Sequence, residues 1–534
     1  MVFPFVHFSS LFTPVIHAQQ LSYQLNSGEW LFHHLDFQLA EGRTALVGRN
    51  GVGKSVLLQL LVGQRAPTSG HVVAHGRIGY YSQQASDQKP QGSIAQYLGV
   101  SQKLNALKQI EKGSVDPRHF EQLEEDWQIE HTTQALLDEL RITQPLDASC
   151  QQLSGGQLAM LTLKRLFLAD NEVLILDEPS NHLDHIGKQW LIEQMRHESR
   201  PILLVSHDRA LLMAVDRVVR LTSEGLHWFD GHYAQYQQQW QAQQEAVTRK
   251  LNHLQREQKA IQREIQKSKE KAQKRESQGK KKRASGSQPK ILTDGMKNSA
   301  ENSRASANIK VQNQLKRNQH LQHNLKQKLV LEEEPKLYLS ETHEHKKRTL
   351  LNVTDYRTQG LTHTPLSFQL KQGERCRLFG ANGVGKSRLL KALTGLHEEY
   401  SGEICRYAPA VYLDQDYQII NLQLSLLENL THFCSGITSN EARLLLAGIG
   451  FRRDSVDRQA AHLSGGEKMK LAMLMVSHVP NQPLLLLDEP DNHLDLESKQ
   501  ALAHALAHYQ GALILVSHDD HFVAEAQITR SWHL

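Results

Sequence analysis

One short pattern occurs twice in this chain, and the repetition constrains the fold more than any other feature of the sequence. The segment VLILDEPSNHLD occupies Val173–Asp184, and LLLLDEPDNHLD occupies Leu484–Asp495. Each copy opens with four apolar residues in a row, as expected for a parallel strand that is buried on both faces. Each then ends in a pair of carboxylates. The two copies predict two α/β domains of the same architecture within one chain.

Other segments recur in the same order and extend the repeat over most of the chain. Three further pairs are GRNGVGKS with GANGVGKS, LSGGQ with LSGGE, and LLVSHD with LILVSHD. Lys54 and Lys386 are 332 positions apart, whereas Ser154 and Ser464 are 310 apart, so the first half holds 332 − 310 = 22 extra residues. Insertions survive where few contacts constrain the chain, so we expect a small helical insertion at the surface, within about 85–150.

The segment between the two halves is strongly basic. Residues 241–330 contain 22 Lys and Arg against 7 Asp and Glu, whereas the rest of the chain has 61 − 22 = 39 basic and 57 − 7 = 50 acidic residues. A long helix is predicted because there is no Gly or Pro from Tyr233 to Gln278 and because apolar residues recur at helical spacing, at Val247, Leu251, Leu254, Ile261 and Ile265.

A polar tract, Gly279–Gly295, follows this helix, and a second helical stretch then runs toward Pro335. Two helices joined by a short basic break predict an antiparallel helical hairpin. The alternative is a solvated linker that binds no specific partner, since runs of charge are often only solvated. We expect an N-terminal extension at 1–14, a first domain at 15–240, the basic linker at 241–335 and a second domain at 336–534.

Composition narrows the class of protein further. The four cysteines are scattered, without the spacing of a zinc site, which indicates a reduced intracellular protein. No run of 18 or more apolar residues exists, so no membrane span is expected. The apolar N-terminus has no Lys or Arg before it, which favours a short extension followed by a strand near Val15 over a signal peptide.

The glycine-rich segments have the chemistry of a phosphate-binding loop. Their glycines let backbone N–H groups turn toward phosphate oxygens at the start of a helix, whose N-terminus favours anions. Within this pattern Lys54 and Lys386 are expected to reach the β- and γ-phosphates, and the hydroxyls of Ser55 and Ser387 to bind Mg²⁺. A single such loop could also be a plain turn, but here it occurs twice.

The repeated carboxylates and histidines complete this chemistry. Asp177 and Asp488 are expected to bind Mg²⁺ through water at the strand ends. The next residue, Glu178 or Glu489, is placed to orient or deprotonate an attacking water. An imidazole that follows an apolar strand can hydrogen-bond the γ-phosphate, and we assign this role to His207 and His518. Standing alone, an acidic strand end or a single histidine would be structural.

The two LSGG segments suggest a second anion site in each half. Ser154 and Ser464 each precede two glycines and an amphipathic helical pattern, so each stands at an expected helix N-terminus. Each half already has one phosphate site in its Lys loop. A single γ-phosphate held by both kinds of site would require two domains that face each other.

The order of these motifs resembles that of the ATP-binding cassette (ABC) ATPases. The lysine loop, YYSQQ or YLDQD, LSGG, LDEP, NHLD and SHD follow one another in both halves and cover nearly all of the chain outside 241–330. Tandem cassettes, DEPxNHLD in both, a charged helical linker and the missing membrane span look like the ABC-F subfamily. The resemblance implies an α/β fold with two P-loop ABC-type nucleotide-binding domains in tandem, joined by a long basic α-helical hairpin.

The resemblance also implies that the halves form a head-to-tail sandwich around two ATP molecules with Mg²⁺. The first ATP site would hold Gly48, Arg49, Asn50, Gly51, Val52, Gly53, Lys54, Ser55, Gln83, Asp177, Glu178 and His207, closed by Ser464, Gly465 and Gly466. The second would hold Gly380, Ala381, Asn382, Gly383, Val384, Gly385, Lys386, Ser387, Gln415, Asp488, Glu489 and His518, closed by Ser154, Gly155 and Gly156. The metal ligands would be Ser55, Gln83, Asp177, Ser387, Gln415 and Asp488.

Members of that subfamily typically act on ribosomes, so the resemblance implies a cytoplasmic, soluble ATPase that works as a translation-associated or antibiotic-protection factor. The protein is expected to be a monomer that contacts rRNA and tRNA through its basic linker, since such a segment suits a polyanionic partner. Two alternatives share every catalytic motif: the ATPase subunit of a transporter with separate membrane subunits, and a DNA-acting ABC-F protein. Asp491 replaces the small hydroxyl residue usual before NHLD, which makes unequal turnover at the two sites plausible.

Overall fold

The computed structural model divides the chain into two compact units. One unit combines Met1–Tyr233 with Pro335–Leu534, and the other is Ala234–Glu334. The expected N-terminal extension, Gln83, Ala381, Asn382 and most of the tract Gly279–Gly295 lie outside the described residues. The described residues are 15–25, 28–82, 89–181, 183–222, 224–284, 313, 315–322, 348–358, 364–380, 383–434, 436–451, 453–479, 484–492 and 494–534.

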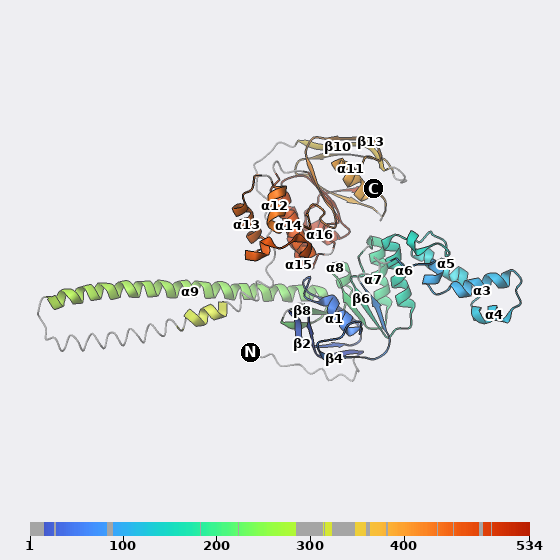
Figure 1. The fold of residues 1–534 in the computed structure, drawn as a ribbon, viewed down its shortest axis with the longest axis horizontal. Helices are drawn as coiled ribbons and strands as arrows, with labels where there is room; N and C mark the ends of the chain where they lie inside the picture. Colours follow the sequence, from blue (N-terminus) through green and yellow to red (C-terminus); the bar gives the residue numbers. More distant parts are fainter. Residues whose placement is uncertain are drawn as a thin grey trace. The chain divides into compact units, whose positions relative to one another are not determined.

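Each cassette is built on a parallel sheet whose central strands are the repeated apolar runs (Figure 1). The order in the first cassette is β5-β6-β7-β3-β8-β9, parallel except for β9, with bounds β5 Ile78–Tyr81, β6 Val173–Asp177, β7 Ile202–Val205, β3 Arg43–Val47, β8 Arg217–Thr222 and β9 Gly225–Asp230. The order in the second is β14-β15-β16-β12-β17, with bounds β14 Ala410–Leu413, β15 Leu484–Asp488, β16 Leu513–Val516, β12 Arg375–Phe379 and β17 Arg530–His533.

A three-stranded antiparallel sheet accompanies each parallel sheet. In the first cassette it has the order β2-β1-β4, and its residues Ile16 and Phe37 share one apolar core with Leu46 of β3 and Leu57 of helix α1 (Lys54–Leu61). The strand bounds are β2 Trp30–Leu39, β1 Ile16–Gln24 and β4 Ser69–Ala74, and, in the second cassette, β11 Leu366–Lys371, β10 Thr349–Thr358 and β13 Tyr400–Arg406.

The helices after the lysine loops and the LSGG segments begin where the sequence predicts, and further helices follow the NHLD and SHD segments. In the first cassette they are α1 Lys54–Leu61, α6 Gly155–Leu168, α7 His185–His197 and α8 Arg209–Leu212. Their counterparts in the second are α11 Lys386–Thr394, α14 Gly465–Ser477, α15 Leu496–His508 and α16 Asp520–Glu525. Helices α6 and α14, which begin at the two LSGG segments, are called the signature helices. Each is preceded on the chain by short 3₁₀ turns, which are η2 Cys150–Gln152 in the first cassette and η3 Arg453–Asp457 and η4 Ala460–His462 in the second.

The first cassette carries more helix than the second between its sheet and its signature helix, where the sequence predicts an insertion. It has α2 Ile94–Tyr97, α3 Ser101–Glu111, α4 Pro117–Leu123 and α5 Ile129–Glu139, whereas the second has α12 Leu426–Phe433 and α13 Ser439–Gly448. The buried residues Leu104, Leu107 and Leu123 belong to a small apolar core of the insertion.

The second unit contains the predicted long helix. Helix α9 runs over Tyr233–Ala284, 52 residues, which at about 1.5 Å per residue corresponds to roughly 78 Å (Figure 1). Residues 315–322 lie against it in the opposite direction, since Asn318 donates to Glu257 and Gln322 donates to the carbonyl oxygen of Leu254. The predicted stripe is the more protected face of α9, with Ile261 buried, while the basic residues around it are exposed: Arg249, Lys250, Arg256, Lys259, Arg263 and Lys267.

Candidate functional site

The two lysine loops have the same geometry. Each follows a central strand and ends in a glycine with left-handed backbone, Gly53 at φ 104° and Gly385 at φ 105°, which forms the N-cap of the next helix. Lys54 Nζ donates to the carbonyl oxygen of Gly48 at 2.7 Å, and Lys386 Nζ donates to that of Gly380 at the same distance. The lysines therefore lie along the inside of their loops, where backbone N–H groups can hold phosphate.

The aspartates predicted to bind Mg²⁺ end strands β6 and β15. Asp177 and Asp488 are 2% and 4% exposed, and the loop serine of the same cassette lies close enough to each carboxyl to lower its pKa. Burial raises the pKa of both carboxyls above the usual value. A serine hydroxyl and a carboxylate held side by side are the oxygen ligands that Mg²⁺ prefers.

The glutamates that follow these strands have a backbone conformation that is rare for a non-glycine residue. Glu178 and Glu489 both have φ 50°, the left-handed region. Such a conformation costs free energy and persists where the surroundings impose it, most often at functional sites. Its occurrence at both members of the repeat indicates that it belongs to the motif.

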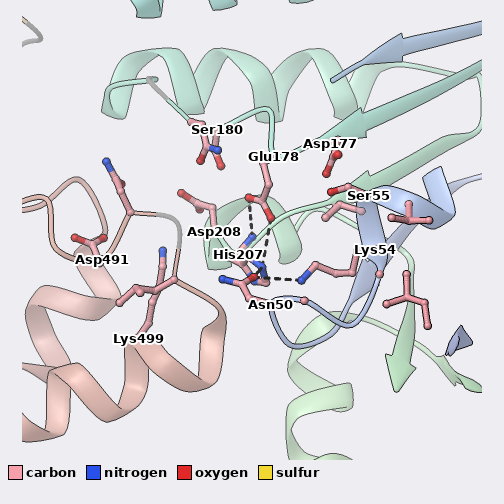
Figure 2. A pocket seen from close by; sticks show the side chains of 18 of the residues that line it. Asn50, Lys54, Ser55, Asp177, Glu178, Ser180, His207, Asp208, Asp491 and Lys499 are labelled. Atoms are coloured by element: carbon pink, nitrogen blue, oxygen red, sulfur yellow. Dashed lines mark hydrogen bonds and ion pairs between the residues drawn. The ribbon is translucent and has the colours of Figure 1, made fainter. Parts of the chain in front are cut away.

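Each glutamate lies beside the histidine of its own cassette. His207 Nε2 is 3.5 Å from Glu178 Oε1 and 3.2 Å from Asn50 Oδ1 (Figure 2). His518 Nε2 is 3.4 Å from Glu489 Oε1. Predicted positions far apart in the sequence thus converge at the carboxyl ends of the parallel strands, where open α/β sheets bind ligands.

The electrostatic surroundings of the two glutamates differ. Burial raises the pKa of Glu178, and burial also lowers the pKa of His207 well below its ordinary value. Burial would raise the pKa of Glu489 too, but hydrogen bonding and the charges of His518 and Lys386 hold it below its usual range. Gln415 Nε2 and Asn492 Nδ2 also donate to Glu489 Oε2, at 2.8 and 2.6 Å.

A cavity of about 430 Å³ lies at the first site, and both cassettes line it. From the first cassette, Lys54, Asp177 and Glu178 contribute to its walls, and Asp491 and Lys499 contribute from the second (Figure 2). A further link between the cassettes is the hydrogen bond from the backbone N–H of Asn50 to Asp495 Oδ2, at 2.9 Å. The lysine loop of the first cassette is therefore in contact with the NHLD segment of the second cassette.

The sandwich prediction pairs the residues of the second LSGG segment, here called signature residues, with the first site. Ser464, Gly465 and Gly466 are not among the described residues that line this cavity. Ser464 caps α14, and its Oγ accepts from the backbone N–H of Glu467. Ser154 caps α6 in the same way, with Gln157 as its partner. The pairing of each signature with the opposite lysine loop stays a prediction.

The residues at the first site fit a hydrated metal ion and a nucleotide phosphate. Asp177 Oδ1, Glu178 Oε1 and His207 Nδ1 are buried and have no hydrogen-bond partner among the described residues. Buried polar atoms are normally paired, so a triad of unpaired atoms at one place indicates a ligand. Apolar side chains, Leu25 and Leu31, line another part of the cavity wall and suit the base of a nucleotide.

Several residues at the two sites are absent from the set of site residues that the sequence predicts. Lys188 and Lys499 both line the cavity, and Tyr412 donates a hydrogen bond to Asp488 Oδ2 at 2.9 Å. The two lysines are 499 − 188 = 311 positions apart, the same offset as Asp177 and Asp488. The repeat itself therefore contained a signal for them. Tyr412 carries a similar signal, because position 80, which is 332 residues earlier, is also tyrosine, but the repeat does not show which residue it contacts.

Comparison with known proteins agrees with this architecture. The family model described as "ABC transporter" matches residues 32–181 and 363–492. The chain is 27% identical to "ABC transporter F family member 5" of Arabidopsis thaliana over 519 residues, which cover 90% of this chain and 70% of that protein. It is 30% identical to "Probable ATP-binding protein YheS" of Haemophilus influenzae over 506 residues, 90% of this chain and 73% of that protein.

Solved structures share the fold at lower identity. "RNase-L Inhibitor" aligns with a TM-score of 0.54 and 17% identity, covering 95% of this chain and 86% of that one. "Model of ribosome-bound archaeal Pelota and ABCE1" aligns with a TM-score of 0.53 and 16% identity, covering 94% and 74%.

Tandem parallel sheets with paired lysine loops and strand-end carboxylates define an ABC-type ATPase, and the chain belongs to the ATP-binding cassette family. Within it, the relatives place the chain in the ABC-F subfamily, as its sequence motifs predict. Among the described residues, no helix is both long enough and apolar enough to cross a membrane.

Proposed function

We propose that this ATPase binds two ATP molecules with Mg²⁺ at the carboxyl ends of its parallel strands and uses their hydrolysis to act on the ribosome. The observation that carries the ribosomal part is the charge of the linker, +15 over residues 241–330 from 22 − 7. Neutralising several phosphates releases counterions, so a segment of this kind binds RNA strongly and with a steep salt dependence. A solved relative of the fold, ABCE1, is described as ribosome-bound, and we extend that partner to this chain on the linker's charge.

The chemistry proposed for each cassette follows from its side chains. The lysine loop binds phosphate oxygens through its N–H groups, and Lys54 or Lys386 adds a positive charge beside them. Mg²⁺, when bound, neutralises charge on the phosphates, and the serine hydroxyl and strand-end aspartate of each cassette would hold it. In this arrangement Ser55 and Asp177 are the ligand pair at the first site, with Gln83 as a further candidate.

Glu178 and Glu489 are the candidates for orienting water. Each glutamate has a left-handed backbone conformation, and its carboxylate lies within 3.5 Å of the imidazole of its own cassette. A general base contributes typically 10²- to 10⁴-fold to a rate, so it is the residue whose loss should stop turnover while leaving the phosphate-binding loop in place. His207 and His518 are then the candidates for hydrogen-bonding the γ-phosphate.

The test uses the full chain with Glu178 and Glu489 both changed to Gln. Glutamine keeps the size and one oxygen acceptor, so ATP binding should persist while turnover falls at least about 100-fold. In ATP the double variant should co-sediment with ribosomes, whereas the wild-type chain should be released as it hydrolyses ATP. Recovery of the variant in a membrane fraction, or on DNA, instead of on ribosomes would reject the ribosomal proposal.

A matched variant separates the linker from the ATPase. Replacing Arg249, Lys250, Arg256, Lys259, Arg263 and Lys267 by Gln removes exposed charge from α9 and leaves its apolar stripe unchanged. If these side chains contact phosphates, the magnitude of the slope of log affinity against log salt should fall by about 4 to 5. Each neutralised phosphate contributes roughly 0.7 to 0.9 to that slope. ATP turnover without ribosomes should stay within about twofold. An unchanged salt slope would assign the linker a purely structural role.

A further inference from the structure

A lysine of the second cassette lies at the first nucleotide site. Lys499, on α15, lines the cavity together with Glu178 and His207 of the first cassette (Figure 2). Its side chain is 13% exposed, and its Nζ is 3.4 Å from Asp519 Oδ2. Asp519 directly follows His518, the histidine of the second site. One ammonium group therefore borders the first site while it is bound to the chain segment that carries the histidine of the second.

The internal repeat supplies a counterpart of this ion pair. Lys188 Nζ lies 2.7 Å from Asp208 Oδ2, and Asp208 directly follows His207. Both side chains are mostly buried, at 15% and 8% exposed. The two pairs are related by the same offset of 311 residues, so the repeat alone would give two equivalent, neutral pairs.

Asp491 breaks this equivalence. The corresponding residue of the first cassette is Ser180, whose hydroxyl lies 3.5 Å from that of Ser206. Asp491 is 3% exposed and lines the first-site cavity, and its Oδ1 has no hydrogen-bond partner among the described residues. A buried carboxylate without full hydrogen bonding needs a nearby positive charge. Burial raises the pKa of Asp491 above its usual value, and the positive charge that opposes this most strongly is that of Lys499.

The field of Lys499 reaches the catalytic candidates of the first site. Burial would lower the pKa of Lys499, but four carboxylates facing it, led by Asp491 and Asp519, raise it, so the ammonium stays charged. In return, its positive charge acts on Glu178 and on His207. The leading influences on Glu489, besides burial, come from its own cassette: His518, Lys386 and Asn492.

We propose that Lys499 is a positioning residue for the first nucleotide site that acts across the cassette interface, and that Asp491 holds its ammonium group there. Lys499 orients the carboxylate of Glu178 and restrains the His207 segment, without bonding to the nucleotide. Because Asp519 binds the same ammonium, movement of the second-site histidine segment is transmitted to the first site. This inference rests on the proposed hydrolytic roles of Glu178 and Glu489.

The experiment measures each site separately in the full chain. The Glu489→Gln background leaves only the first site active, and the Glu178→Gln background leaves only the second. Lys499→Met should lower kcat of the first site about tenfold with the KM for ATP within twofold, and should change the second site by less than twofold. Lys499→Arg should recover at least half of the first-site rate, and Asp491→Ser, which copies the first cassette, should lower it about threefold.

The control removes a different ion pair between the cassettes. Arg209 Nη1 lies 2.6 Å from Glu525 Oε1, and neither residue is among those that line the cavity. Arg209→Met should therefore affect both sites equally or neither. If Lys499→Met slows both sites alike, or if Arg209→Met reproduces the selective loss at the first site, Lys499 contributes only to docking of the cassettes and the proposal is overturned.

A readout that does not depend on hydrolysis separates this proposal from the proposed function. In amide hydrogen exchange, Lys499→Met should speed exchange of peptides covering 203–212, which include His207, at least threefold, and Glu525→Gln, which removes the control ion pair from outside these peptides, should not. Unchanged exchange there would overturn the positioning role. If the double Glu→Gln variant still hydrolysed ATP at the wild-type rate, the catalytic assignment would fail, while faster exchange in Lys499→Met would still support the contact across the interface.

Discussion

The lysine loop of the first cassette allows a quantitative test, because a Cβ added at one of its glycines would collide with a neighbour and a Cβ added at another would not. Gly53 has φ +104°, and a Cβ added there would lie 2.5 Å from Leu31 Cδ2 and 2.7 Å from its Cγ. Gly51 has φ +82°, and a Cβ added there would meet nothing within 4 Å. Alanine at either position therefore pays the cost of a left-handed backbone, but only at Gly53 does it also collide with a neighbour.

The expected magnitudes follow from these two terms. A left-handed conformation costs an L-residue about 1–2 kcal/mol. Overpacking adds typically 1–3 kcal/mol, so Gly53→Ala should cost about 2–5 kcal/mol against about 1–2 for Gly51→Ala. The strain is relieved if the free loop changes shape, and ATP binding must then restore the native shape. The difference of about 1–3 kcal/mol should appear as a roughly 5- to 150-fold weaker affinity of Gly53→Ala.

The assay is an equilibrium titration with Mg·ATP in a Lys386→Ala background, which weakens the second site so that the first dominates the signal. Thermal unfolding of both variants checks that the cassette remains folded. Equal affinities for Gly53→Ala and Gly51→Ala would show that the Leu31 contact is irrelevant to the shape of the loop. A weaker affinity for Gly51→Ala than for Gly53→Ala would contradict the whole steric argument.

Three further outcomes are expected. Arg200→Ala removes hydrogen bonds to carbonyl oxygens near the end of α6 and should destabilise the first cassette by about 1.5–3 kcal/mol, measured as a shift in denaturant midpoint. Tyr412→Phe removes the hydrogen bond to Asp488 and should raise the Mg²⁺ concentration needed for second-site turnover about tenfold, as for other outer-shell partners of metal ligands. Lys188 overcomes burial and holds the pKa of Asp208 below its usual value, so this carboxylate stabilises the fold above the unfolded pKa. That contribution should disappear as the pH falls below about 4 through the lower folded pKa, and Asp208→Asn should flatten stability measured over this range.

Features of the fold that depend only on residues close together in the sequence could be predicted. The apolar runs before Asp177 and Asp488 became central strands because an uninterrupted apolar segment can only be buried on both faces. Ser154 and Ser464 became helix N-caps because each has a Gln or Glu three residues later that completes a capping box. Such local patterns specify the elements that hold the site.

Contacts between the halves could not be predicted in the same way. The hydrogen bond from Asn50 to Asp495 joins residues 445 positions apart, and no periodicity relates them. The part played by Lys499 depends on which surface of α15 meets the first cassette, and this is decided by packing of two domains. The order of the motifs indicates that the two sites share one interface. It does not show which side chains contact the opposite cassette.

The two sites are built from nearly identical motifs and still differ in the surroundings of their glutamates. Glu489 accepts hydrogen bonds from Gln415 and Asn492, and charges of its own cassette favour its ionised form. Glu178 is governed first by burial, and the positive charge that acts on it from across the interface is that of Lys499. The two glutamates of the repeat therefore have the same backbone conformation but different electrostatic environments. Two copies of a catalytic motif in one chain can therefore differ in the charge around their glutamates when a single position of the repeat differs, here Asp491 in place of Ser180.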